Sequence, residues 1–339
     1  MDYRAAVVGC GGVSRFHTRA YLAHPSVNLV AACDPQDDTR NGYAEEFQLD
    51  AVFREAGEML DAVRPDIVSI CAPNATHAPL AILAASKGVR GIVCEKPMAM
   101  TLPEADAMLE ACREAGTRLI VNHQRRFEQS FMVAKQLLKS GTIGRLLRME
   151  AAIGDWDLMS WGTHWLDIFG FYNDDCPAEW VIGRVDLSDP KHFFGHHVER
   201  AGLAKIHYAN GVEAVYQGGD VAAGMNNRLF GTEGVMEVEP LCPEGIGEPI
   251  RLLNSTSAGW QIVDLPREDH VQQPFTRSLA AFIESIETGA THPLEGGSAR
   301  HALEQILGIY ESSRSRTVVR LPLQIDDNPF LEMLEGRSR

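Results

Sequence analysis

The sequence predicts an α/β protein with two domains. The N-terminal domain is a Rossmann domain, a doubly wound parallel sheet, and the C-terminal domain is α+β, built on a large, mostly antiparallel open sheet. Three observations predict this class. Short β-branched apolar runs alternate with helical patterns over the first third of the chain, which is typical of β-α-β units. A glycine-rich turn follows the first run. Beyond residue 122, runs that alternate apolar and polar residues predominate, as in a sheet with one face in water.

The first third supplies a complete set of strands and crossover helices, and each helix candidate ends at a proline, at a glycine or in a short loop. The strands are predicted at 4–8, 29–33, 66–71, 91–94 and 119–122, with a weaker one at 51–53. The helices are predicted at 14–23, 38–47, 56–63, 76–87 and 102–115. Right-handed crossovers join such elements into a doubly wound sheet. We therefore expect a dinucleotide-binding domain at residues 1–122.

The remaining residues, 123–339, are expected to form the second domain. One amphipathic helix is predicted at 131–138, before the alternating runs begin. Strands are predicted at 146–153, 180–185, 204–208, 213–217, 227–230 and 235–238. Helices at 278–287 and 298–313 would cover the sheet, and 318–323 is a final strand or an extended tail.

Composition limits the functional classes. The chain has 339 residues, enough for two domains, and its 31 Lys+Arg against 46 Asp+Glu give a net charge of −15. This charge repels a phosphate backbone, so nucleic acid is not an expected partner. No apolar run approaches the roughly 18 residues of a membrane span, so no membrane is expected either.

Cysteine usage and the N-terminus favour a cytoplasmic location. The seven cysteines are odd in number and form no Cys-x-x-Cys pair, which favours a reducing compartment and argues against a zinc knuckle. The N-terminus enters a strand directly, without a signal-peptide pattern. His192, His196 and His197 lie close together, but we interpret them as part of a solvated loop or strand and expect no metal site.

The strongest local motif is Gly9-Cys10-Gly11-Gly12-Val13-Ser14, between the first strand and the first helix. Gly9 would permit the tight turn, and Gly11 would let the backbone approach a pyrophosphate held by the helix N-terminus. Gly12 and Val13 are also expected to hold the cofactor. Ser14 occupies a position that is normally Gly or Ala. Alone, such a motif can equally be a turn that binds nothing.

Asp34 favours a nucleotide. It closes the second strand, twenty residues after Ser14, where a carboxylate can bind the ribose hydroxyls of NAD and repel a 2′-phosphate. Arg40 lies near enough in the sequence to keep NADP open. The alternative is that Asp34 only caps a turn with Pro35.

Two further strand ends carry polar residues. Pro73, Asn74 and His77 follow the strand at 66–71, and Glu95-Lys96-Pro97 follows the strand at 91–94. Ligands of open α/β sheets bind beyond the carboxyl ends of the strands, so these residues are expected near the same ligand. Without this placement, Lys96 would read as part of a surface turn.

Together these motifs resemble the Gfo/Idh/MocA (glucose-fructose oxidoreductase and inositol dehydrogenase) family. The resemblance covers nearly the whole chain, and the order and spacing of the motifs make it specific. It rests on Gly9-x-Gly11-Gly12 with His17, Asp34-Pro35, Pro73-Asn74 with His77, Glu95-Lys96-Pro97, Asn122 with Arg125-Arg126-Phe127, Gly162-Thr163-His164 with Asp167, Phe230-Gly231-Thr232-Glu233-Gly234 and Tyr310-Glu311-Ser312.

The resemblance implies NAD(P)-dependent chemistry on sugars or cyclitols and a homo-oligomer, a dimer or tetramer, formed through the C-terminal sheet. Lys96 is similar to the family's active-site lysine and His164 to its catalytic histidine. An imidazole can accept the alcohol proton, and an ammonium can stabilise the alkoxide or relay the proton. Asp167, one helical turn after His164, would bind substrate hydroxyls or orient the ring. The alternative for His164 is a core histidine bonded to the backbone.

One position departs from the family pattern. The family often has an aspartate four residues before the histidine, and this chain has Ser160 there. Asp155 or Asp157 could substitute through a shifted loop. Alternatively, Ser160 binds only substrate, while Lys96 and His164 carry the proton.

Aromatic and basic residues near these motifs are candidates for substrate binding. Trp161, like Trp156 and Trp165, would stack against a sugar ring or pack in the core. Arg125 would bind a substrate hydroxyl, a carboxylate or a cofactor phosphate, and one of the two adjacent arginines could form an interdomain ion pair. We include Asp155 among the substrate-binding candidates.

The sequence therefore predicts an enzyme: an NAD-dependent dehydrogenase or reductase, NADP not being excluded, that acts on a secondary alcohol of a carbohydrate or an inositol-like polyol. Glu95, Asn74, His77 and Pro73 would lie near the cofactor. A second hypothesis is a sugar hydrolase or lyase that oxidises its substrate transiently, without net redox change. A third is a cofactor-binding sensor, against which the presence of both Lys96 and His164 argues.

Overall fold

A computed structural model describes residues 2–222, 225–238, 250–266 and 268–336. The chain divides into two compact units. Met1–Gln124 and Val271–Arg300 form the first, and Arg125–His270 and His301–Arg339 form the second.

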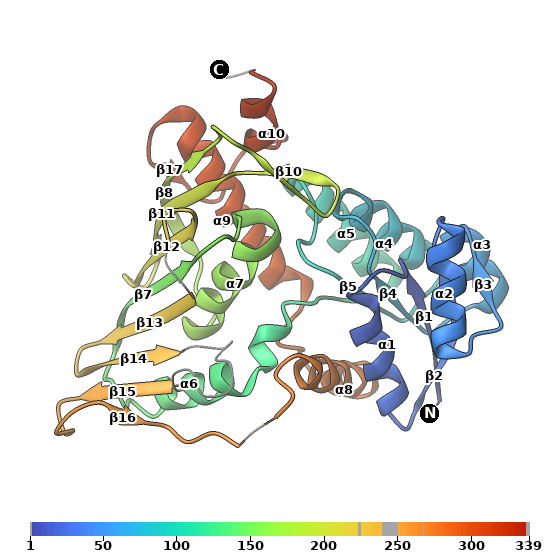
Figure 1. The fold of residues 1–339 in the computed structure, drawn as a ribbon, viewed down its shortest axis with the longest axis horizontal. Coiled ribbons are helices and arrows are strands. Elements are labelled where there is room, and N and C mark those ends of the chain that lie inside the picture. The colour runs from blue at the N-terminus through green and yellow to red at the C-terminus, as the bar shows by residue number, and fades with distance from the viewer. Residues whose placement is uncertain (1, 223–224, 239–249, 267, 337–339) are drawn as a thin grey trace. The chain divides into compact units, whose positions relative to one another are not determined.

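The first unit is a Rossmann domain (Figure 1). Within the described residues its sheet has six strands, all parallel, in the order β3-β2-β1-β4-β5-β6. The strands are β1 (Tyr3–Val8), β2 (Val27–Cys33), β3 (Val52–Phe53), β4 (Ile67–Ile70), β5 (Gly91–Cys94) and β6 (Arg118–Val121). Every residue of β4 and β5 is buried, because helices cover both faces of a parallel sheet. The predicted doubly wound sheet is confirmed.

The crossover helices of this unit also follow the sequence pattern. They are α1 (Ser14–Ala23), α2 (Asp37–Phe47), α3 (Ala56–Val63), α4 (His77–Ser86) and α5 (Leu102–Ala115). A short 3₁₀ turn, η1 (Asn74–Thr76), precedes α4. Helix α5 begins with a capping box between Thr101 and Glu104 and ends at Gly116, whose φ is 67°, as helix start and stop signals predict.

Helix α8 (Gln272–Thr288) belongs to the first unit, although the sequence analysis placed its residues at 123–339. It packs on α1, where the rings of Phe275 and Phe16 stack with centroids 5.2 Å apart. A Cβ on Gly91 of β5 would lie 2.8 Å from Phe282 and Ile286. The segment thus buries an apolar face against strands encoded far earlier, a pairing that local periodicity does not reveal.

The second unit is built on a large mixed sheet. In the part of the chain that the structure describes, it has nine strands in the order β16-β15-β14-β13-β7-β12-β11-β8-β17. They are β7 (Leu146–Ile153), β8 (Ala178–Asp186), β11 (Ala201–Tyr208), β12 (Glu213–Gly219), β13 (Met225–Gly231), β14 (Gly234–Val238), β15 (Ile250–Asn254), β16 (Gln261–Ile262) and β17 (Val319–Arg320). Strands β7 and β12 pair in parallel, and the other pairs are antiparallel. The predicted, mostly antiparallel sheet is confirmed.

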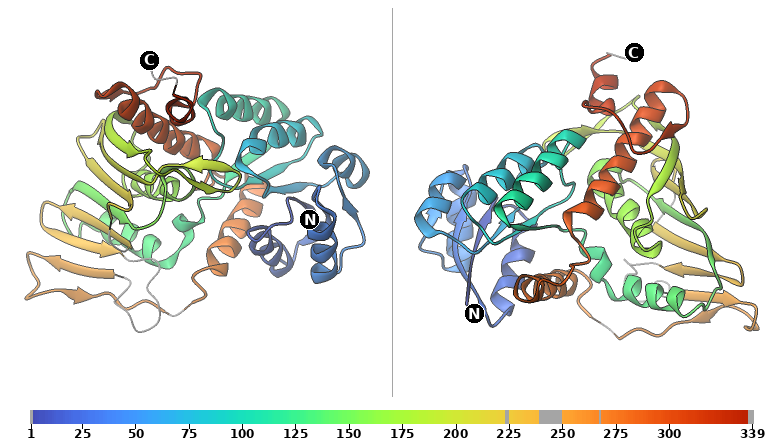
Figure 2. Two further views of the ribbon diagram at one scale, coloured as in Figure 1. Left: turned by 45° about the horizontal axis from the view of Figure 1, so that its top comes forward. Right: turned by 180° about the vertical axis from the view of Figure 1, so that it is seen from behind.

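Helices pack on this sheet, as Figure 2 shows. Helix α6 (Gln129–Lys139) contacts β14, and α9 (Gly296–Ser315) packs on β8, where Ser312 Oγ accepts a hydrogen bond from Gly183 N at 3.0 Å. A short helix, α10 (Pro329–Leu334), follows.

Helix α7 (Thr163–Tyr172) contains His164 and Asp167, for which the sequence predicted a helical turn but no helix bounds. Most of its residues are buried, so it lacks the polar stripe that marks an amphipathic helix. The histidine-rich segment is a two-stranded hairpin, β9 (Lys191–Phe193) and β10 (His196–Val198). Its turn residues Phe194 and Gly195 have φ of 48° and 87°. Among the described residues, no helix is long and apolar enough to cross a lipid bilayer.

Candidate functional site

The glycine-rich turn joins β1 to α1 in the first unit. Gly9 has a φ of 90°, and a Cβ there would lie 2.5 Å from the carbonyl oxygen of Cys71. A side chain at residue 9 is therefore excluded both by the backbone conformation and by the neighbouring strand end. The fold itself requires this glycine.

Gly11 and Gly12 are different. Neither has a positive φ, and no heavy atom of the described residues lies within 4 Å of a Cβ built on either one. The N-cap, Val13, makes no side-chain capping bond within the described chain. The positive end of α1 therefore faces open space at two residues without side chains. This arrangement fits a pyrophosphate, which helix N-terminal amides bind.

Ser14 fits its unusual position because its hydroxyl bonds locally. Ser14 is fully buried, and its Oγ donates to the carbonyl oxygen of Gly11 at 2.6 Å. A hydroxyl beside the strand is thus satisfied within the turn.

Asp34 is tied to the same turn. One carboxylate oxygen accepts a hydrogen bond from the backbone N–H of Cys10 at 2.9 Å, and the other accepts from Gln36 N at 2.8 Å. Arg40 donates to the backbone carbonyl of Asp34 at 2.8 Å and pairs with Asp37 at 2.8 Å. The structure thus places an acid at the end of β2, next to the open turn, and engages Arg40 elsewhere.

His77 joins two strand ends. Its ring nitrogens lie 2.9 Å from the carbonyl oxygen of Ala72 and 2.8 Å from that of Pro97, and the residue is fully buried. Burial lowers the pKa of His77. Pro73 and Asn74 lie between these contacts, at the start of η1. The ring therefore fixes the loop after β5 to the loop after β4.

Glu95 lies at the centre of a buried polar network. Its Oε1 is 2.9 Å from Nε2 of His17 and accepts from the side-chain amide of Asn122 at 2.7 Å. Burial opposes ionisation of Glu95, but the contacts with His17, Lys96 and Asn122 outweigh it and lower the pKa to about 2. Glu95 is therefore an anion held inside the protein.

The network continues away from Glu95 toward α1. The other ring nitrogen of His17 lies 3.0 Å from the hydroxyl oxygen of Ser69, which is 2.6 Å from that of Tyr21. A small internal cavity adjoins His17, Tyr21 and Asn122. The contacts link a helix to the carboxyl ends of three neighbouring strands.

Lys96 is more exposed than its neighbours in the sequence. It is half-buried, whereas every other residue from 91 to 100 is buried. Its backbone N–H lies 3.3 Å from Glu95 Oε2. The residues on either side of Lys96 are thus anchored, Glu95 by His17 and Asn122, and Pro97 by His77.

In the second unit, His164 lies on a helix that begins irregularly. A π-helical turn, η3 (Leu158–Gly162), runs directly into α7, which contains the buried residues His164 and Asp167. Asp157 caps the turn, with its Oδ1 accepting from Ser160 N at 2.6 Å. Short π-helical segments are frequent at functional sites.

The two acids near Ser160 differ. Asp155 has a φ of 63° and a side chain that is 90% exposed, 4.0 Å from Lys191. Asp157 is buried and contacts the backbone of residue 160. Ser160 Oγ lies 3.3 Å from Nε2 of His196 on the hairpin.

Glu199 approaches the same helical turn from the segment between β10 and β11. Its Oε1 accepts from Leu158 N at 2.5 Å, and its Oε2 accepts from the Tyr310 hydroxyl at 2.8 Å. Burial and the neighbouring Asp157 raise the pKa of Glu199 to about 7. The sequence analysis missed Glu199, because nothing in its local sequence distinguishes it from a surface acid.

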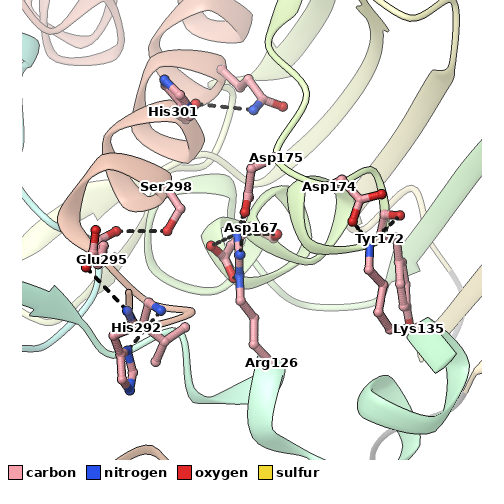
Figure 3. A network of polar contacts seen from close by, with 12 residues as sticks. Arg126, Lys135, Asp167, Tyr172, Asp174, Asp175, His292, Glu295, Ser298 and His301 are labelled. Atoms are coloured by element: carbon pink, nitrogen blue, oxygen red, sulfur yellow. Dashed lines mark hydrogen bonds and ion pairs between the residues drawn. The ribbon is translucent and has the colours of Figure 1, made fainter. Parts of the chain in front are cut away.

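Asp167 makes a buried ion pair with Arg126 (Figure 3). Two guanidinium nitrogens donate to its two carboxylate oxygens at 2.7 and 2.8 Å. Arg126 also contacts Asp175 at 2.7 Å, and Lys135 contacts Asp174 at 2.6 Å. The Arg126 pair lies within the second unit, so it is not the interdomain pair that the sequence analysis considered.

Arg125 lies among tryptophan rings. Its guanidinium carbon is 5.5 Å from the ring centroids of both Trp156 and Trp165, and it contacts Glu128 at 3.1 Å. Trp165 is fully buried, a core position. Trp161 is half-buried, stacks on Trp156 at 4.6 Å and lies 5.9 Å from Phe194.

Comparison with known proteins finds a family model that matches the N-terminal part of the chain. Residues 3–123 match the sequence model of the Gfo/Idh/MocA oxidoreductase family, described by its NAD-binding Rossmann fold. The N-terminal part of the chain is therefore similar in sequence to this family. The match covers most of the first unit, whose six-stranded parallel sheet agrees with an NAD-binding Rossmann fold.

Two curated relatives show the range of activities among similar sequences. D-apiose dehydrogenase from Paraburkholderia graminis is 34% identical over 142 residues, 42% of this chain and 38% of that protein. A 2,7-anhydro-N-acetylneuraminate hydratase from Mediterraneibacter gnavus is 29% identical over 152 residues, 45% of this chain and 40% of that protein. The matches thus span less than half of either relative.

The fold of the chain is also that of solved structures. A levoglucosan dehydrogenase in complex with NADH and levoglucosan superposes with a TM-score of 0.84 at 20% identity, covering 95% of this chain and 100% of that chain. This likeness extends the fold assignment well beyond residues 3–123.

Proposed function

We propose that this protein is a member of the Gfo/Idh/MocA family and an NAD-dependent dehydrogenase or reductase that acts on a secondary alcohol of a sugar, a sugar derivative or an inositol-like polyol. The observation that carries the proposal is the turn after β1. Asp34 is bonded to the N–H of Cys10 in a turn whose next two residues lack side chains at the open end of α1. A pyrophosphate and an adenosine ribose need these two features side by side.

The cofactor preference follows from charge. When NAD is bound, its ribose hydroxyls would donate to the Asp34 carboxylate, which repels a 2′-phosphate. Arg40 is held by Asp37 and by the carbonyl of Asp34, which supports NAD over NADP.

The reaction needs a hydride acceptor and a base. Bound NAD supplies the acceptor, at carbon 4 of its nicotinamide ring. His164 would take the hydroxyl proton, and the Lys96 ammonium would stabilise the negative charge on the alcohol oxygen. The alcohol thereby loses a hydride to the cofactor and a proton to the protein, and becomes a carbonyl.

Arg125, Trp161 and Asp155 are proposed as substrate-binding residues. The half-buried Trp161 supports stacking on the apolar face of a sugar ring better than the fully buried Trp165 does. Asp167 would act less directly, because both of its carboxylate oxygens are bonded to Arg126.

The test is to incubate the purified protein with NAD or NADP and a panel of sugars and cyclitols, following cofactor absorbance and product mass together. The proposal predicts stoichiometric NADH and a product two mass units lighter. Lys96→Ala is expected to lower turnover about a hundredfold or more with NAD affinity unchanged. An unchanged turnover would reject the role of Lys96.

A second function, transient oxidation followed by elimination, hydration or hydrolysis, is supported by the hydratase among the relatives. It predicts that substrate is converted without accumulation of NADH. The paired readout of absorbance and mass separates the two functions.

We also propose a cytoplasmic homo-oligomer formed through the large sheet. Ile182 on β8 and Leu203 on β11 are 42% and 48% exposed, and their strands are neighbours. A second copy of the chain would bury them. Light scattering should show a dimer or tetramer that Leu203→Glu weakens.

A further inference from the structure

Two buried carboxyl groups lie at the start of the helix that carries His164. Asp157 accepts a hydrogen bond from Ser160 N, and Glu199 accepts one from Leu158 N. Both acceptors thus bind N-terminal amides of one continuous helix, residues 158–172. Glu199 is 41 residues away in sequence from Leu158, whose amide it binds, and both acids are almost completely buried.

One negative charge is favourable at the N-terminus of this helix, whereas two negative charges are unfavourable. The amides and dipole of a helix N-terminus stabilise a single carboxylate. A second charge in the same buried turn is opposed by desolvation and by the first. In the part of the chain that the structure describes, the titratable groups that act on Glu199 are Asp157, which is the N-cap of η3, Tyr310 on α9 and Tyr216 on β12, and none of the three is a cation.

The surrounding contacts make the turn sensitive to that second charge. The Tyr216 hydroxyl donates to the backbone carbonyl of Asp157 at 3.4 Å. A Cβ on Gly162 would lie 2.6 Å from the same hydroxyl oxygen. The π-helical turn is therefore closely packed, and separation of the two carboxylates would displace the residues that lead into His164.

We propose that Asp157 and Glu199 share a single proton and act as positioning residues for His164, so that activity is lost when this proton leaves for solvent. The high pKa of Glu199 agrees with a retained proton. The inference rests on the proposed dehydrogenase function and deepens it, because it assigns one limb of the pH profile to a pair that does not touch the substrate.

The first test is the pH profile of kcat. In the wild type, kcat should fall about tenfold per pH unit once the shared proton is lost above neutrality. Glu199→Gln keeps an acceptor for Leu158 N but cannot ionise, so it should stay active and lose this alkaline limb. Asp157→Asn should also lose the limb, because only one charge then remains.

Glu128→Gln is the matched control. Glu128 lies in the same unit, is almost completely buried, and burial likewise raises its pKa to about 7, but it contacts Arg125 and not the π-helical turn. Its replacement should alter the pH dependence of unfolding and leave the alkaline limb of kcat in place. Loss of the limb in Glu128→Gln would overturn the inference.

Two results for Glu199→Gln would also overturn the inference. The variant could be active and keep the alkaline fall in kcat, or it could be folded and inactive at every pH. The second test needs no substrate. As the pH rises from about 4.5 to about 7, the free energy of unfolding of the wild type should decrease, and that of Glu199→Gln should decrease less. If no sugar or cyclitol of the panel is oxidised, the dehydrogenase proposal fails. If the free energy of unfolding depends equally on pH in the wild type and in Glu199→Gln, the shared proton is refuted.

Discussion

His17 Nε2 lies 2.9 Å from Glu95 Oε1, and both side chains are buried in the first unit. The pair joins the first helix after the glycine-rich turn to the residue before Lys96. The glycine-rich turn and the proposed catalytic lysine are therefore linked through one buried contact, supported on the Glu95 side by Asn122.

His17→Ala is expected to destabilise the protein by about 3–5 kcal/mol, because removal of one partner leaves a buried carboxylate without adequate compensation. Urea unfolding at pH 7 measures the change. Tyr21→Phe is the control, since it removes only the distal contact with Ser69 and should cost about 1 kcal/mol. A loss below 1 kcal/mol for His17→Ala would contradict the importance of the pair.

The low pKa of Glu95 makes the stability of the protein depend on pH in acid. Its pKa is about 2 in the folded protein, below the ordinary 4.5, so the folded state binds its proton less readily than the unfolded state does. The stabilisation is fully present above about pH 4.5 and is lost as the pH falls toward 2; it amounts to about 3 kcal/mol. Glu95→Gln should therefore unfold with a weaker dependence on pH across this window, and equal slopes would refute the prediction.

The sequence predicts much of this unit because its information is local. The strand–turn–helix order places Gly9, Gly11 and Asp34 correctly relative to β1, α1 and β2. The partners of the buried polar groups could not be predicted from local sequence. The contact of Glu95 with His17 spans 78 residues, and that of Glu199 with Leu158 spans 41; no periodicity encodes either.

Sequence spacing also predicted which residues share a helix turn, but it did not predict their contacts with other elements. Asp167 does follow His164 by one turn of α7, as predicted. Its bidentate pair with Arg126 could not be predicted, because tertiary packing alone brings η2 (Gln124–Phe127) to α7.

Replacement of Gly9 and replacement of Gly11 are expected to have opposite effects on stability and on NAD binding. Gly9→Ala should destabilise the protein by more than about 2 kcal/mol, because its φ is positive and the Cβ would meet the carbonyl of Cys71. Gly11→Ala should leave stability within about 1 kcal/mol and weaken NAD binding about tenfold or more by obstructing the pyrophosphate.

Thermal unfolding and calorimetric titration with NAD check both variants. Unaltered NAD affinity in a folded Gly11→Ala protein would show that the open end of α1 does not hold the cofactor.

The Arg126–Asp167 pair predicts strong coupling within the second unit. Each partner is almost fully buried, so Arg126→Ala and Asp167→Ala should each destabilise by about 3–5 kcal/mol, since either change strands a buried charge. The double variant should lose clearly less than the sum, because it strands neither. Urea unfolding of the four proteins measures the coupling.

Asp175→Ala is the matched control, because Asp175 contacts the same guanidinium but is half exposed, and it should cost about 1 kcal/mol or less. Additive losses from the two buried partners would mean that the pair does not act as a unit. Asp167 would then be available for substrate, whereas strong coupling assigns it to holding α7, and with it His164, in place.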